Sequence, residues 1–77
     1  MSVVAVLFKG VFMAITRHFM ERMIERQVSE SEILKTLQSP DMISDSKHGG
    51  RKKIYQRKSI FVVIDEDERT LITVWRR

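Results

Sequence analysis

The first half of the chain carries apolar side chains at helical spacing. From Thr16 to Pro40 they recur every three or four positions, which predicts two short helices. Thr16 is the expected N-cap of the first helix, and Ser29 with Glu32 forms the capping-box pattern that starts the second. Ser39 and Pro40 end the second helix, because the residue before a proline is biased away from helical backbone angles. A very short turn joins the two helices, so they are expected to be neighbours in space.

Each predicted helix has one apolar side that is expected to face a core. In the first helix this side consists of Phe19, Met20, Met23 and Ile24. In the second helix it consists of Ile33, Leu34 and Leu37. Both helices are therefore predicted to pack on another layer of structure.

The spacing changes to that of strands in the second half of the chain. A short strand is predicted at Met42 and Ile43. Three longer strands are predicted at 52–57, 59–65 and 70–76. The run from Phe61 to Ile64 is continuously apolar, which is typical of a central strand. The pattern predicts an α+β fold in which two N-terminal helices pack on one face of a three- to four-stranded antiparallel sheet.

The apolar start of the chain leaves several interpretations open. Residues 1–12 are an apolar N-terminal extension or an edge strand, and 13–77 form a single α+β domain. Two short strands turning at Lys9-Gly10 are an alternative, as is a true start at Met13. The run is too short and interrupted to span a bilayer and lacks the pattern of a secretory signal. We therefore expect a cytoplasmic protein without a membrane partner.

Composition and charge narrow the classes of function. With 77 residues the chain forms one domain at most, and without cysteine it has neither disulfides nor thiolate metal ligands. Its net charge of +4 is unevenly distributed, because the segment 46–58 contains six basic residues and no acidic one. A concentrated basic segment favours a polyanionic partner, although it also keeps a small protein in solution.

A row of polar side chains follows the flank of the first predicted helix. His18, Arg22 and Arg26 are spaced four positions apart, so they lie on one side of the helix. One interpretation is a row aimed at a phosphate group, because arginine binds such anions with two parallel hydrogen bonds. The alternative is an ordinary lattice of salt bridges with neighbouring glutamates.

The strand predicted at 52–57 could supply a second part of a site. Alternation places Arg51, Lys53, Tyr55 and Arg57 on one face. Cations contact phosphates while a tyrosine ring stacks on a base, which predicts a nucleic-acid surface. The alternative is a half-buried tyrosine on a strand whose cations protect a sheet edge. Further nucleic-acid contacts are predicted for His48 in the Gly-rich turn and for Arg76.

Motifs for metal and nucleotide chemistry are missing from the sequence. It contains no HExxH, GxGxxG, GxSxG or phosphate-loop pattern. His18 and His48 lack the supporting ligands of a zinc site. We therefore predict neither a metal nor a cofactor, and any catalysis is expected to be acid–base or electrostatic.

The ordered pieces of the sequence resemble the bacterial family catalogued as domain of unknown function 4258. The resemblance runs from about Ile15 to Arg76. The matching positions are Thr16, His18, Arg22, Arg26, Ser29, Pro40, Val63 and Thr73. Gln27 departs from the pattern, which has glycine there, and this implies a strained or altered turn between the helices.

The layout that this resemblance implies is similar to small ribonuclease toxins of the RelE and BrnT kind. Such toxins cleave RNA without a metal and are neutralised by an antitoxin. We therefore expect a toxin-like protein that acts on RNA, with His18 as general acid or base. Arg22, Arg26 and Arg57 would hold the phosphate, and Tyr55 would stack on a base or share proton transfer.

Two other interpretations remain open at this point. One is a non-catalytic regulatory module that binds nucleic acid or a protein through the same basic face. The other treats the apolar N-terminus and Trp75 as the surface of a homodimer. RNA, an antitoxin-like protein and a second copy of the chain are therefore the candidate partners, and Lys53 is expected to steer the RNA backbone.

Overall fold

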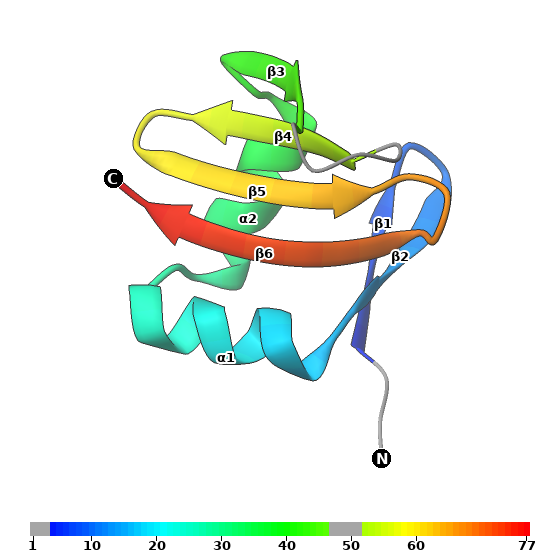
Figure 1. Cartoon of the computed structure of the whole chain (residues 1–77), viewed down its shortest axis with the longest axis horizontal. Helices are drawn as coiled ribbons and strands as arrows, with labels where there is room; N and C mark the ends of the chain where they lie inside the picture. The colour runs from blue at the N-terminus through cyan, green and yellow to red at the C-terminus, as the bar shows by residue number, and fades with distance from the viewer. Residues whose placement is uncertain (1–3, 47–51) are drawn as a thin grey trace.

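The computed structural model describes residues 4–46 and 52–77, in which two helices pack against one sheet (Figure 1). In chain order the elements are β1 (Val4–Phe8), β2 (Val11–Ile15), α1 (Arg17–Arg26), α2 (Glu30–Gln38), β3 (Met42–Asp45), β4 (Lys52–Arg57), β5 (Ile60–Asp65) and β6 (Thr70–Arg76). The bounds of β4 and β6 are those predicted from the alternation of side chains. Neither helix in the described part of the chain is long and apolar enough to cross a membrane.

The strands form one six-stranded mixed sheet in the order β1-β2-β6-β5-β4-β3. Every neighbouring pair is antiparallel except β2 and β6, which are parallel. The antiparallel three- to four-stranded sheet predicted from the sequence is therefore wrong, and the RelE-like layout implied with it is not confirmed. Local spacing shows that a segment is a strand but not which strand pairs with it. Here β2 pairs with β6, which comes from the far end of the chain.

The N-terminal run contributes β1 and β2 to this sheet. Lys9 and Gly10 form the turn between them, with φ of 54° and 75°, the left-handed pair that two-residue hairpins favour. After this turn β2 pairs with β6 at Ala14–Thr70 and leads directly into α1. Of the alternatives for the start of the chain, the structure has two short strands that turn at Lys9-Gly10.

The helix termini follow the predicted capping signals. The side chain of Thr16 accepts a hydrogen bond from the Phe19 amide at 3.1 Å, and Ser29 and Glu32 form the complete capping box. Gln27 is the C-cap of α1 and adopts left-handed angles, with φ 55° and ψ 44°. Gln27 thus adopts the left-handed conformation of a glycine cap, in which a side chain is less favourable than glycine.

One face of the sheet, which we call the helix face, packs against both helices and carries Tyr55, Val62 and Val74. These side chains form a core with Phe19 of α1 and Ile33 of α2. The opposite face, which we call the open face, carries the alternate residues of the same strands. β5 lies in the middle, and its run from Phe61 to Ile64 is buried as predicted.

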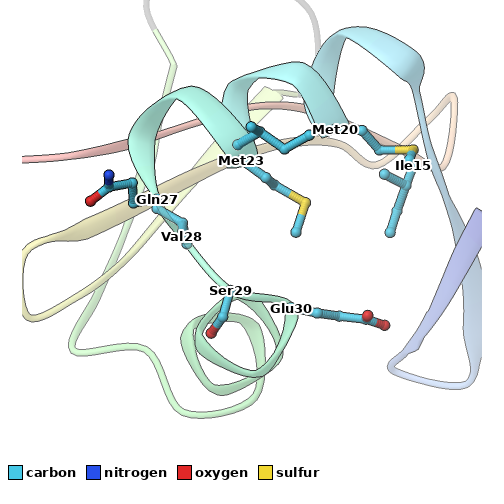
Figure 2. A pocket seen from close by; sticks show the side chains of 8 residues that line it. Ile15, Met20, Met23, Gln27, Val28, Ser29 and Glu30 are labelled. Carbon is cyan, nitrogen blue, oxygen red and sulfur yellow. The ribbon is translucent and has the colours of Figure 1, made fainter.

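The predicted apolar side of α1 is only partly in the core. Phe19 is buried, whereas Met20 and Ile24 are 41% and 77% exposed. The expectation that all four residues face the core is therefore wrong, because α1 lies at the side of the sheet over β6 and only part of its surface meets that strand. Met20 and Ile24 instead line an apolar groove of ≈ 500 Å³ with Ile15 and Val28. Figure 2 labels Ile15, Met20 and Val28 in this groove.

Candidate nucleic-acid interface

The row predicted on α1 lies on an exposed helix surface. His18 occupies the first turn of α1 and Arg26 the last, and both are exposed. Arg22 forms an ion pair with Glu25, as the salt-bridge interpretation expects. His18 is exposed on α1 whereas Tyr55 is 1% exposed, so these two side chains do not share an accessible surface.

Tyr55 lies in the core. Only 1% of it is exposed, and its ring packs edge-on against Phe8 with ring centres 5.4 Å apart. The Lys9 ammonium group donates a hydrogen bond to the Tyr55 hydroxyl at 3.3 Å. The predicted role in stacking on a base is therefore wrong, because both faces of this ring are covered by protein. Alternation correctly predicts which residues of the strand share a face with Tyr55. That face, however, packs against the helices.

Lys53 belongs to an ion pair with a neighbouring strand. Its ammonium group lies 3.0 Å from Asp45 Oδ1, and the two residues face each other in the register of β3 and β4. The hydrogen bond and the charge of Asp45 raise the pKa of Lys53. Asp45 is largely exposed, so this pair offsets only part of the charge of Lys53. Two further predicted contacts, His48 and Arg51, lie outside the described residues.

Two of the predicted residues, Arg57 and Arg76, meet in one pocket at the end of the sheet. They occupy the same cross-strand row, on either side of Ile60 in β5. The pocket has a volume of ≈ 220 Å³. It is lined by Glu32, Lys35, Thr36, Arg57, Lys58, Ser59, Ile60 and Arg76, and we call it the basic pocket.

The strands and the end of α2 position the cations of the basic pocket. Arg57 Nη1 donates to the Ser39 carbonyl oxygen at 2.9 Å, which attaches β4 to the C-terminus of α2. Lys58 forms the turn to β5 with φ 55°, and its amide donates to Asp41 Oδ2 at 2.7 Å. Lys35 comes from the last turn of α2. Three separate segments therefore bring their cations to one place.

Glu32 is the one carboxylate among the lining residues of the basic pocket. Arg76 Nη2 lies 3.0 Å from Glu32 Oε2 and also donates to the Gln27 carbonyl oxygen at 2.8 Å. The hydrogen bond from the Ser29 amide and the charge of Arg76 hold the pKa of Glu32 below its usual value. Glu32 is therefore ionised at neutral pH, and it fixes the guanidinium group of Arg76.

The remaining cations of the basic pocket are not neutralised by carboxylates. In residues 4–46 and 52–77, no ion pair engages Lys35, Arg57 or Lys58. Four lining cations face Glu32, and Asp41, which accepts from the Lys58 amide, adds a second carboxylate beside the pocket, so positive charge is still in excess at this end of the sheet. Guanidinium and ammonium groups in this arrangement can bind phosphate oxygens.

Sequence reasoning identified only part of this pocket. Arg57 and Arg76 were predicted as site residues, whereas Lys35 and Thr36 were not. Lys58 was counted in the basic segment, but it was not assigned a role. The sequence does contain one signal for Lys35. It lies in the last turn of α2, just before Ser39–Pro40 ends the helix and the chain continues into the strands. Lys35 shares this pocket with the β4–β5 turn only because α2 packs on the sheet.

Comparison with known proteins identifies a family and gives no closer relative. The family model described as "Domain of unknown function (DUF4258)" matches residues 15–76. This is most of the chain, and the chain therefore belongs to that family. A search of curated proteins and a search of solved structures gave no match.

Proposed function

We propose that this member of the DUF4258 family binds RNA in the cytoplasm and that the basic pocket holds the phosphate backbone. The observation that carries the proposal is the convergence of Lys35, Arg57, Lys58 and Arg76 on one pocket, where they outnumber the carboxylates of Glu32 and Asp41. Arginine and lysine side chains that contact phosphates release condensed counterions, which drives binding to nucleic acids. Both arginines are also tethered to backbone carbonyl oxygens, which limits the entropy that binding would cost.

The spacing of the arginines favours a chain of phosphates over a single small anion. Arg57 and Arg76 lie on β4 and β6, with β5 between them. Two strand spacings amount to about 10 Å between their backbones. A polymer can place one phosphate at each arginine, whereas a single small anion offers only one charged group to the pair.

Cleavage of RNA is a separate prediction, which comes from the resemblance to toxins. An antitoxin-like partner belongs to the same prediction. His18 is the residue predicted for proton transfer, yet it is not among the lining residues of the basic pocket. Binding is therefore the function that the geometry supports best.

The proposal is tested with two variants that lose the same number of positive charges at different places. In the pocket variant, Lys35, Arg57 and Lys58 are each replaced by glutamine. In the helix variant, Arg17, Arg22 and Arg26 are each replaced by glutamine, which lowers the net charge equally. We expect the pocket variant to bind a single-stranded RNA oligonucleotide at least about tenfold more weakly than the wild type. The helix variant should retain most of the affinity, as measured by fluorescence anisotropy.

Equal losses in the two variants would contradict the proposal, because binding would then depend on net charge alone. The same reactions, analysed on a denaturing gel in the presence of a chelator, test cleavage. Products made by the wild type but not by His18→Ala would support the nuclease prediction. Products made equally by both would exclude His18 as the general acid or base.

A further inference from the structure

The open face of the sheet contains a second hollow, on the side opposite the helices. This groove has a volume of ≈ 690 Å³. Its apolar lining comes from Ile54, Val63, Ile72 and Trp75. The lining also includes polar side chains, namely Ser44, Asp45, Ser46, Lys52 and Thr73. We call it the Trp75 groove.

A break in the strand register shapes this groove. The pairing of β5 with β6 shifts between Val63 and Ile64, so β6 has one more residue than β5 at this point. As a result the consecutive residues Ile72 and Thr73 both line the groove, whereas a regular strand would turn them to opposite faces. The bulge thus places a methyl-rich side chain and a hydroxyl group side by side.

The indole ring of Trp75 is held in a defined orientation. It stacks on Phe61 with ring centres 5.0 Å apart and an angle of 2° between the planes. Phe61 is buried, and the Arg77 guanidinium carbon lies 5.0 Å from its ring centre. Trp75 itself remains partly exposed and forms one wall of the groove. A rigid, partly exposed indole is a surface on which another flat ring can stack.

The composition of the Trp75 groove suits a nucleobase. A base has apolar faces and hydrogen-bonding edges, and the groove offers an indole and aliphatic side chains together with hydroxyl groups. Among the described lining residues, the two charged ones are Lys52 and Asp45, which have opposite signs. The neighbouring Arg77 adds a cation for the backbone that carries the base.

The groove and the basic pocket are adjacent through the sheet. Phe61 and Trp75 form one cross-strand pair, and Ile60 and Arg76 form the next. A strand of RNA that passes around the β4–β5 turn would meet Arg57, Lys58 and Arg76 on one side of the sheet. It would then meet the Trp75 groove on the other side.

The geometry points to the Trp75 groove as a binding site for an unpaired base. This inference rests on the proposed function, and it specifies single-stranded RNA as the ligand, since a base within a duplex is already stacked and paired. Stacking on Trp75 supplies the contact that depends on a base, while the basic pocket supplies the contact that depends on phosphate.

The chain contains one tryptophan, so its fluorescence reports this site directly. The wild-type protein is titrated with an octauridylate and with an abasic oligonucleotide of equal length and charge. We expect both to bind, as followed by anisotropy of labelled copies, but only the octauridylate should quench Trp75 strongly. Trp75→Leu should lower the affinity for octauridylate about tenfold and leave that for the abasic oligonucleotide unchanged. Trp75→Phe keeps an aromatic ring, so its affinity for octauridylate should fall less than that of Trp75→Leu.

Different failures of this experiment have different meanings. If neither oligonucleotide binds, the proposed function fails, and the base site fails with it. If both bind equally and the fluorescence of Trp75 is unchanged, the phosphate contact stands and the base site is wrong. If the fluorescence instead changes with protein concentration in the absence of RNA and sedimentation shows a dimer, a second copy of the chain covers this face, which also overturns the inference.

Discussion

The two faces of the sheet differ in how far their aromatic side chains are exposed. On the helix face, Tyr55 is 1% exposed and packs against Phe8 beneath the helices. On the open face, Trp75 stacks on Phe61 but remains partly exposed beside a groove. The sequence placed Tyr55 on a predicted nucleic-acid surface, with a half-buried structural tyrosine as the alternative, and gave Trp75 as part of a homodimer surface in one alternative. The difference shows that the face that helices cover decides which aromatic stabilises the core and which is available to a ligand.

The largest expected effect is on the free energy of unfolding when Tyr55 or Trp75 is truncated to alanine. Tyr55→Ala should lower the free energy of unfolding by about 3 to 5 kcal/mol, because it opens a cavity in the core. Trp75→Ala should cost about 1 to 2 kcal/mol, because the ring is already partly exposed. Urea unfolding followed by circular dichroism measures both values.

Tyr55→Phe is the matched control for the core. It keeps the ring and loses only the hydrogen bond from Lys9, so a cost of about 0.5 to 1 kcal/mol is expected. Similar losses for Tyr55→Ala and Trp75→Ala would contradict the distinction between the two faces.

A smaller effect, of opposite sign, is expected at the turn between the helices. Gln27 has left-handed backbone angles, so Gln27→Gly should raise the free energy of unfolding by about 0.5 to 1 kcal/mol. The Gln27 carbonyl oxygen that accepts from Arg76 is retained. Gln27→Ala keeps the strain and should bring no gain. The open face should not respond, and an altered Trp75 emission spectrum in Gln27→Gly would break the separation of the two faces.

The smallest effect concerns pH and the ion pair between Glu32 and Arg76. Since the pKa of Glu32 is lowered in the folded protein, its stabilising effect is present above the ordinary value of 4.5 and is lost as the pH falls through the folded pKa. Glu32→Gln keeps an acceptor for the capping box but loses the ion pair. At neutral pH we expect it to be less stable by a few tenths of a kcal/mol, since the pair is partly exposed.

The difference between wild type and Glu32→Gln should shrink as the pH falls below 4.5. Urea unfolding at a series of pH values measures it. A difference that stays constant down to acidic pH would show that the carboxylate charge does not contribute.

Local signals in the sequence predicted most of the elements. Thr16, Ser29 and Pro40 gave the bounds of the helices, and alternation gave β4 and β6. The parallel pairing of β2 with β6 was missed, because it joins segments from opposite ends of the chain. Alternation also cannot reveal which face of a strand the helices will cover.

The candidate site was predictable to a smaller extent. Arg57 and Arg76 were identified from their charge and position, and both line the basic pocket. Lys35 was not identified, because only the packing of α2 on the sheet brings it to the β4–β5 turn. His18 was joined to Tyr55 and Arg57 by the type of residue alone, and Tyr55 is buried whereas His18 is exposed on α1.

The most direct test of the basic pocket is the salt dependence of RNA binding. The logarithm of the association constant for octauridylate is measured against the logarithm of the salt concentration, for the wild type and the pocket variant that lacks the charges of Lys35, Arg57 and Lys58. For a single strand the slope is about −0.7 for each phosphate that a cation neutralises. We predict that the pocket variant has a slope shallower by about 2, because its three glutamines no longer neutralise phosphates. An unchanged slope would contradict the claim that these three cations hold the phosphate backbone.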